Sequence, residues 1–279
     1  MKTVVLAGMG KLPFEAVKKL QERGESVTVV AFTEQIAMDL SSLAVEVQVF
    51  SIAQVGKILK YLRSIKADAM LFIGKIDRSI MEKNLKFDLK AISMLAKLRD
   101  RQEDTMMLAI IEEVEKLGVS VCSQREVLSH LIAKPGLYSM HKPNKKESED
   151  IAFGYRKMKA VAGLDIGQSI VVKNKTVLAV EAIEGTNETV KRGGSYAKGG
   201  FTFVKVAKPN QDYRFDLPAV GLETLDIFIN CGGRVFAVEA DSTIIADYDA
   251  CVQRADENGV VFLGFTPQEL VCRTAEHPY

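Results

Sequence analysis

The chain has 279 residues, of which 47% are hydrophobic and 26% are charged. Such a length and composition indicate one large or two ordinary globular domains and exclude a disordered or fibrous protein. Lysines and arginines number 37 against 36 aspartates and glutamates, so the formal net charge is +1. A protein that binds nucleic acid through its net field needs a basic excess, and we therefore expect no nucleic-acid partner.

The sequence also lacks the usual signs of a membrane or secreted protein. No apolar run reaches the ~18 residues that span a bilayer, and no small-residue cleavage site follows the apolar N-terminal stretch. The four cysteines are scattered without CxxC spacing, which favours reduced thiols and argues against a structural zinc site. We expect a cytoplasmic protein, with a homodimer, the commonest soluble oligomer, as its default assembly.

The first half of the chain alternates short β-branched runs with amphipathic helical patterns. Strands are predicted at 3–8, 26–32, 45–50, 69–74 and 119–122, and helices at 13–24, 51–66 and 106–118. Strands that alternate with helices pair in parallel through right-handed crossovers. Residues 1–133 are therefore predicted to form a Rossmann-like, doubly wound α/β domain.

The periodicity fails at residues 134–150, where prolines, a glycine and a mixed charge run are typical of a linker. Residues 151–279 are predicted to form a second, catalytic domain of α/β or α+β class. Its expected elements are a helix at about 148–163, a hairpin at 169–182, strands at 232–240 and 259–265, and a helix at 243–257 between those two strands.

A glycine-containing turn follows the first predicted strand. Gly8 and Gly10 let the backbone approach a ligand closely, and the helix that begins at Pro13 offers free N–H groups to a phosphate. The dinucleotide fingerprint would place a third glycine at Pro13 and an acidic residue at the end of the second strand, where Glu34 is an approximate match. The motif favours a phosphate or nucleotide over NAD in particular, and a tight turn without a ligand is the alternative.

The fourth predicted strand ends in Gly74 and Lys75, and Arg78 follows. In an open parallel sheet, ligands bind outside the carboxyl ends of the strands. These residues are therefore expected to face the same crevice as the glycine turn and to hold a phosphate. The alternative is two solvated surface cations.

Charged residues concentrate in two segments of the second half. Glu181 and Glu184 follow a predicted strand, and the run 205–216 carries lysines, an arginine and aspartates. Carboxylate oxygens suit a hard cation such as Mg²⁺, and a metal beside lysine and arginine suits phosphate chemistry. The alternative is a salt-bridged surface loop.

Asp216 is distinctive because it lies between Phe215 and Leu217, just before Pro218. The proline disfavours helix at Leu217, so we expect an extended or turned segment whose neighbours point to alternate sides. An aspartate in such a place is partly desolvated unless it meets a cation or a metal. Its structural alternative is a cap before the helical pattern at 220–228.

Four motifs, taken together and in order, are specific. They are GxGxLP at 8–13, LDIGQ at 164–168, AVEAIEGT at 179–186 and K-P-x-Q-D-x-R-x-D-L-P-x-x-G at 208–221. With them the chain resembles, over essentially its whole length, the LpxI family of UDP-2,3-diacylglucosamine pyrophosphatases.

The resemblance implies two α/β domains and an Mg²⁺-dependent hydrolysis in lipid A biosynthesis. Water would attack the α-phosphorus of UDP-2,3-diacylglucosamine and release UMP and 2,3-diacylglucosamine 1-phosphate, which is lipid X. The aspartate of the D-L-P segment, here Asp216, matters for catalysis in such enzymes. The family commonly reads E-G-T-D where this chain has Asn187, which keeps an oxygen ligand but loses the charge. A peripheral enzyme at the inner membrane face would fit the lipid-linked UDP-sugar substrate.

The site residues follow from this combined interpretation. Asp216, Glu181 and Glu184 are predicted to hold Mg²⁺, and Lys208 and Arg214 are predicted to act with Asp216 in catalysis by offsetting phosphoryl charge. Substrate binding is predicted for a larger set of residues: Gly8, Gly10, Lys11, Leu12, Pro13, Gly74, Lys75, Arg78, Gln168, Thr186 and Gln211.

The alternative to this enzyme is a non-catalytic, Rossmann-type nucleotide-binding or regulatory protein.

Overall fold

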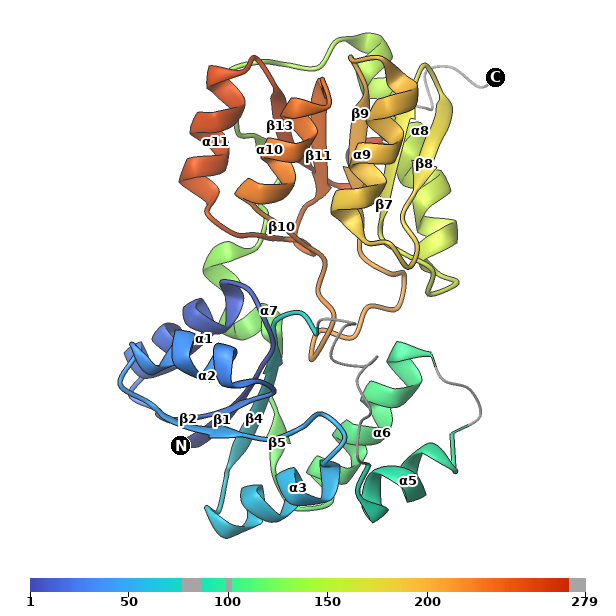
Figure 1. The fold of residues 1–279 in the computed structure, drawn as a ribbon. Coiled ribbons are helices and arrows are strands. Elements are labelled where there is room, and N and C mark those ends of the chain that lie inside the picture. The colour runs from blue at the N-terminus through green and yellow to red at the C-terminus, as the bar shows by residue number, and fades with distance from the viewer. Residues whose placement is uncertain (77–86, 99–101, 271–279) are drawn as a thin grey trace. The chain divides into compact units, whose positions relative to one another are not determined.

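Residues 1–76, 87–98 and 102–270 are described by the computed structural model, and the chain divides into two units (Figure 1). Unit 1 comprises Met1–Ser129 with Tyr213–Phe215, and unit 2 comprises His130–Asp212 with Asp216–Tyr279. Among the described residues, no helix is both long enough and apolar enough to cross a membrane.

The sheet of unit 1 has five strands in the order β3-β2-β1-β4-β5. Every neighbouring pair is parallel. With helices between the strands, this order confirms the predicted Rossmann-like, doubly wound fold. The strands are β1 (Lys2–Ala7), β2 (Ser26–Ala31), β3 (Glu46–Val49), β4 (Ala69–Ile73) and β5 (Ser120–Val121).

Helices cover both faces of this sheet, with α1 and α2 on one face and α3 and α6 on the other (Figure 1). Because side chains alternate along a strand, Val4 and Leu6 of β1 both face α3 and α6 and join their apolar cluster. Phe215, brought into unit 1 by its loop, is buried in the same cluster. The helices are α1 (Leu12–Glu22), α2 (Glu34–Ser41), α3 (Val55–Ser64), α5 (Leu89–Leu95), α6 (Glu103–Glu115) and α7 (Gln124–Val127).

Unit 2 contains a mixed sheet of six strands in the order β6-β13-β11-β9-β7-β8. The three strands β13, β11 and β9 are parallel, whereas β6, β7 and β8 run antiparallel to their neighbours. The bounds are β6 (Gly136–Leu137), β7 (Ser169–Lys173), β8 (Thr176–Val180), β9 (Thr202–Lys205), β11 (Val235–Glu239) and β13 (Val261–Phe265), with a separate parallel pair β10 (Ala219–Val220) and β12 (Ile244–Ile245).

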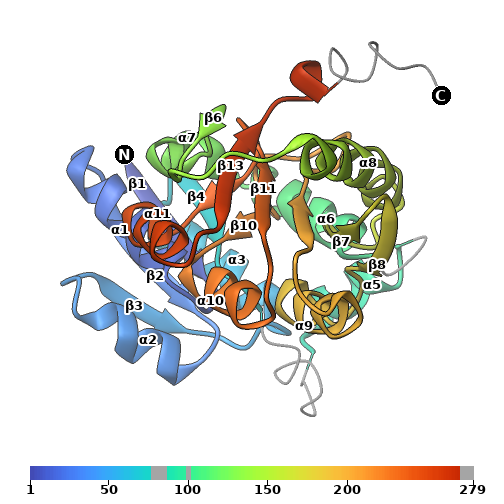
Figure 2. The same cartoon turned by 90° about the horizontal axis from the view of Figure 1, so that it is seen from above.

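One long helix covers one face of the second sheet and three helices cover the other (Figure 2). Ile151 and Met158 of the long helix α8 pack against the β7 and β9 side, and Phe228 of α10 packs against Phe203 and Phe236. The helices are α8 (Lys145–Ala162), α9 (Thr186–Ala197), α10 (Leu222–Asn230) and α11 (Tyr248–Glu257), and η1 (Ser129–Leu131) is a short 3₁₀ turn at the start of unit 2.

The helices α2, α5 and α9 were not among the predicted elements, and two of the predicted segments differ in the structure. Residues 134–150, expected to be a linker, contain β6 and the first turns of α8, because a capping box between Asn144 and Glu147 starts the helix early. The helix expected at 243–257 begins only at Tyr248. The residues before it form β12, and Asp247 has a left-handed backbone with φ of 55°.

Candidate functional site

In unit 1, the glycine turn after β1 packs directly on the end of β4. Gly8 N donates to Ile73 O at 2.8 Å, and Met9 and Lys75 exchange two backbone hydrogen bonds of 2.7 and 3.0 Å. A Cβ at Gly8 would lie 2.5 Å from Lys75 O. Gly8 is therefore required because the ends of β1 and β4 approach each other closely. Both strand ends were predicted to face one crevice.

The remaining turn residues lead into α1. Gly10 has a φ of 102° with open space around its Cα, and Lys11 is the N-cap residue of α1 without a side-chain cap. Leu12 and the buried Pro13 begin the helix. The structure thus brings the turn together with Gly74 and Lys75, whereas Arg78 lies outside the described residues. Phosphate binding at this turn stays a prediction.

In unit 2, Asp216 is presented by a loop between two buried apolar residues. Phe215 and Leu217 are buried, while the Asp216 side chain is 45% exposed. This alternation is the one predicted from the sequence. The backbone of Asp216 is left-handed, with φ of 54°, a conformation that aspartate tolerates better than most residues.

The Asp216 carboxylate accepts two interactions on one oxygen. Lys208 Nζ lies 3.0 Å from Oδ2, and Gln168 Nε2 donates to the same atom at 3.2 Å. Lys208 Nζ also lies 2.6 Å from Asp165 Oδ1. The ammonium group of Lys208, on a side chain only 10% exposed, therefore bridges two carboxylates.

Gln211 fastens this loop to itself rather than reaching outward. Its Oε1 accepts from Lys208 N at 3.2 Å, and its Nε2 donates to the carbonyl oxygen of Asp216 at 3.0 Å. The side chain thereby joins the backbones of the two charged residues that form the bridge, which suits a structural role as well as the predicted substrate contact.

Gly167 allows the segment that carries Asp165 and Gln168 to lie against the end of β8. A Cβ at Gly167 would come within 2.2 Å of Glu181 O, and Gln168 N donates to Glu181 Oε2 at 3.2 Å. Gln168 is buried, and its Oε1 has no hydrogen-bond partner. This unsatisfied acceptor belongs to the same amide group as the Nε2 that donates to Asp216.

Glu181 belongs to a buried polar network of its own. Its Oε2 lies 3.0 Å from Lys205 Nζ, and its Oε1 accepts from Thr186 Oγ1 at 2.8 Å. Lys205 also donates to Thr186 at 2.9 Å. Burial raises the pKa of Glu181, but the Lys205 charge and the hydrogen bonds from Ser169, Thr186 and Lys205 together outweigh it and lower the pKa to about 2. Glu181 is therefore a fixed anion at neutral pH.

The other predicted acidic and basic residues have separate partners. Glu184 pairs with Arg192 of α9 and accepts from Thr189 at 3.3 Å, and Arg214 pairs with Glu115 of α6 at 3.0 Å within unit 1. Within the described part of the chain, no three His, Cys, Asp or Glu side chains are grouped so as to hold a metal ion. The structure brings Lys208, Gln168 and Gln211 to Asp216, but gives Glu181, Glu184 and Arg214 their own counterions.

Asn187, at the position where an aspartate is common in the resembled family, links the N-terminal turns of two helices. Its Nδ2 donates to Glu223 Oε1 at 3.0 Å, and its Oδ1 accepts from Thr224 Oγ1 at 2.9 Å. An aspartate could accept from Thr224 but could not donate to Glu223. The amide is thus matched to the carboxylate that α10 presents.

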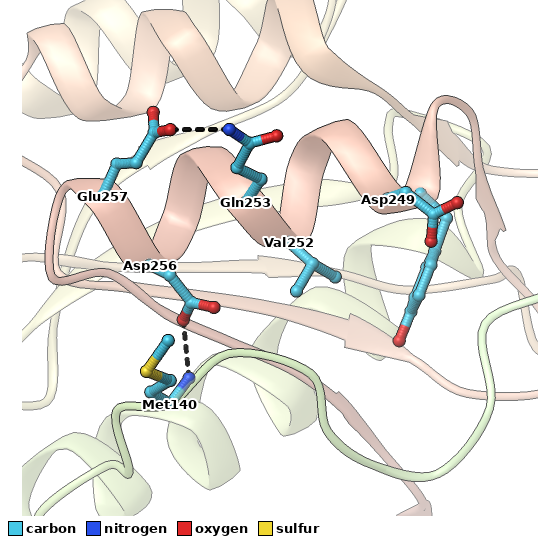
Figure 3. A pocket seen from close by; sticks show the side chains of 7 residues that line it. Met140, Asp249, Val252, Gln253, Asp256 and Glu257 are labelled. Atoms are coloured by element: carbon cyan, nitrogen blue, oxygen red, sulfur yellow. Dashed lines mark hydrogen bonds between the residues drawn. The ribbon is translucent and has the colours of Figure 1, made fainter.

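Two pockets of the described structure lie apart from most of the predicted site residues. One, of about 560 Å³, runs along α11, where Asp256 accepts from Met140 N at 2.6 Å (Figure 3). None of its lining residues was predicted to be functional. A second, of about 700 Å³, includes Glu184 and Arg192. The lining of the first comprises Met140, Tyr248, Asp249, Val252, Gln253, Asp256 and Glu257.

Sequence reasoning did not select Asp165 or Lys205 for the site. Asp165 lies inside the LDIGQ motif, and Lys205 is the first residue of the charged run 205–216. Both therefore belong to segments that the sequence marked as candidates. The missing signal was their partners, which lie 24 residues or more away along the chain. An ion pair across strands leaves no periodic trace in one sequence.

Two family models match nearly the whole chain. The one described as LpxI N-terminal domain matches residues 2–131, and the one described as LpxI C-terminal domain matches residues 134–263. Among curated proteins, the chain is 28% identical over 281 aligned positions to the UDP-2,3-diacylglucosamine pyrophosphatase LpxI of Caulobacter vibrioides. That alignment covers 96% of this chain and 99% of the relative.

Proposed function

This chain belongs to the LpxI family, and from that membership we propose that it is a UDP-2,3-diacylglucosamine pyrophosphatase of lipid A synthesis. The proposed reaction joins the oxygen of water to the α-phosphorus and breaks its bond to the bridging oxygen. UMP leaves on one side, and 2,3-diacylglucosamine 1-phosphate carries the bridging oxygen away on the other. The relative that the chain matches over nearly its full length carries this activity in its name.

The observation that carries the proposal is the arrangement around Asp216. A half-exposed carboxylate, held by Lys208 at 3.0 Å and Gln168 at 3.2 Å, stands on a loop whose flanking residues are buried. A fixed anion beside a fixed cation can orient an attacking water and offset the charge that develops on a phosphoryl group.

Mg²⁺ fits the donor set at this place. Proteins commonly hold Mg²⁺ with one or two carboxylates together with substrate phosphates and waters, not with a complete cage of side chains. Asp216 offers a carboxylate, and the unsatisfied Gln168 Oε1 offers a neutral oxygen on the amide group whose Nε2 donates to that carboxylate. A buried acceptor without a donor costs about 1–3 kcal/mol, which a cation or its water would relieve. When bound, Mg²⁺ would supply charge neutralisation and activate a water.

The chain's own residues then have distinct tasks. Asp216 and Gln168 would hold the cation, and Lys208 would face the phosphoryl charge. The predicted ligands Glu181 and Glu184 have their own partners, Lys205 and Arg192. We therefore assign Glu181, which accepts from Gln168 N, to the support of the segment that carries Gln168. Burial raises the pKa of Glu181, but Lys205 and the neighbouring hydroxyls lower it by more. The resulting low pKa keeps the Glu181 carboxylate charged throughout the neutral range.

A direct assay tests this function. UMP release from UDP-2,3-diacylglucosamine is measured with Mg²⁺ and with EDTA, for the wild type and for Asp216→Asn. We expect release only with Mg²⁺, and a loss on the order of a hundredfold in the variant, because charge stabilisation at a reacting phosphoryl group is the main catalytic resource. Asp226→Asn is the control, since Asp226 forms an ion pair with Arg254 on α11.

Equal rates in all conditions would remove the metal-and-aspartate mechanism, and no UMP from any reaction would remove the pyrophosphatase. Calorimetry with UDP and with NAD then examines the non-catalytic hypothesis. Tight NAD binding without UDP binding would favour a Rossmann-type regulatory protein.

A further inference from the structure

Among the described residues, Lys208 contacts two aspartates, which lie at unequal distances. Its Nζ lies 2.6 Å from Asp165 Oδ1 and 3.0 Å from Asp216 Oδ2, and the lysine side chain is 10% exposed. Asp165 is 21% exposed and has a left-handed backbone with φ of 56°. The shorter contact is thus with the residue that no motif argument placed in the site.

A second cation at Asp216 would compete with the ammonium group. Two positive charges on one carboxylate repel each other, so a divalent ion can bind Asp216 only as Lys208 gives up part of its pairing with that residue. Because Lys208 is largely buried, loss of a counterion is costly unless another carboxylate remains in contact. Asp165 is in contact already.

We propose that Asp165 is a positioning residue that retains Lys208 when a divalent cation takes Asp216. In this arrangement Asp165 does not touch the cation. It lowers the cost of cation binding by keeping the ammonium paired, and it leaves the positive charge of Lys208 beside the site. The inference rests on the proposed function insofar as Asp216 is a cation ligand, and it adds a residue whose effect must pass through Lys208.

Direct cation binding is the sharpest readout, because it does not require turnover. Mn²⁺, which takes the same oxygen ligands as Mg²⁺, is titrated into the full-length protein, and free Mn²⁺ is counted by electron paramagnetic resonance. Competition with Mg²⁺ identifies the shared site. The variants are Asp165→Asn, Lys208→Met and the double variant, with Asp216→Asn to confirm the ligand.

The expected order of affinities is specific to this proposal. Asp165→Asn should weaken Mn²⁺ binding about tenfold, a coupling usual for charges in contact, because the ammonium then holds Asp216 more firmly. Lys208→Met should bind Mn²⁺ at least as tightly as the wild type, because the competing charge is gone. In the Lys208→Met background, Asp165→Asn should have less than a twofold effect.

The control variant is Asp226→Asn, which removes one negative charge elsewhere in unit 2. The Asp226 carboxylate forms an ion pair of 3.0 Å with Arg254. It should change Mn²⁺ affinity less than twofold, and circular dichroism and thermal unfolding verify that each variant is folded. If Asp165→Asn also weakens binding tenfold without Lys208, Asp165 is itself a ligand and the proposal is wrong. Unchanged affinity in Asp165→Asn, or no saturable Mn²⁺ site in the wild type, overturns it as well. The expected order without any UMP release would uphold the positioning role and reject the pyrophosphatase.

Discussion

Glu181 Oε2 lies 3.0 Å from Lys205 Nζ, and the exposed fractions of the two side chains are only 11% and 6%. The pair joins the end of β9 to the residue that follows β8, next to the segment that carries Gln168. Removing one member leaves a buried charge without its main counterion, which is far more costly than removing both.

Glu181→Gln should therefore lower the free energy of unfolding by about 3 kcal/mol, and Lys205→Met by a similar amount. The double variant should recover most of that loss, because neither charge remains. Urea unfolding followed by circular dichroism measures all three. Additive losses in the double variant would mean that the two residues stabilise the fold independently.

The same carboxylate predicts how stability depends on pH. Its pKa falls from 4.5 to about 2 in the folded protein, because Lys205 and three hydrogen bonds outweigh burial. A depressed pKa stabilises the folded state fully above the unfolded value of 4.5, and this contribution is lost as the pH falls through about 2. At about 1.4 kcal/mol per unit it is of order 3 kcal/mol.

The wild type should accordingly lose stability between pH 5 and pH 2 more steeply than Glu181→Gln, so that the two unfolding curves approach each other in acid. Urea midpoints at half-unit intervals of pH provide the comparison. Parallel curves for the two proteins would contradict the assignment of a low pKa to Glu181.

The glycine turn of unit 1 offers a matched pair of substitutions. In Gly8→Ala the new Cβ would meet Lys75 O at 2.5 Å and Gly74 C at 2.7 Å, both backbone atoms, so a loss of about 3 kcal/mol is expected. In Gly10→Ala nothing lies within 4 Å and only the φ of 102° is unfavourable, which costs about 1–2 kcal/mol. Thermal unfolding ranks the two, and equal losses would show that contact with the β4 end is not what requires Gly8.

Gly167 provides a corresponding test in unit 2, with activity as the readout. Gly167→Ala would place a Cβ 2.2 Å from Glu181 O and push away the segment that carries Asp165 and Gln168. Misplacing supporting groups by about 1 Å can cost a hundredfold in rate, so we expect kcat for UMP release to fall by at least about tenfold. Gly163→Ala, whose nearest neighbours are 3.5 Å away, should retain its activity. Full activity in Gly167→Ala would separate this segment from catalysis.

Much of the fold can be predicted from one sequence because the patterns that determine it are local. The strand and helix patterns of residues 1–133 lead directly to the parallel sheet of unit 1, and Lys173 to Lys175 mark the β7–β8 hairpin. The alternation at Asp216 is local too, since Pro218 and two flanking apolar residues specify it. The early start of α8 was also within reach, because Asn144 and Glu147 have capping-box spacing.

The candidate site is less legible because its geometry depends on contacts across the sheet. In the sequence, Glu181, Glu184 and Asp216 are simply three acidic residues. Only the structure reveals that each forms an ion pair with a different basic side chain. Composition predicts that such charges are paired or bound to metal, but it does not choose among partners. Asp165 was overlooked for the same reason, since its contact with Lys208 spans a helix end and a distant loop.

The positive φ of 54° at Asp216 also determines which substitution can test the role of this residue. Asparagine is at ease in that backbone conformation, whereas alanine and branched side chains are not. An alanine replacement would therefore strain the backbone between Phe215 and Leu217 at the same time as it deletes an acid, and its phenotype would mix two causes. The amide replacement keeps this backbone conformation while it removes the charge and turns one acceptor oxygen into a donor, which makes it the variant from which chemistry can be inferred.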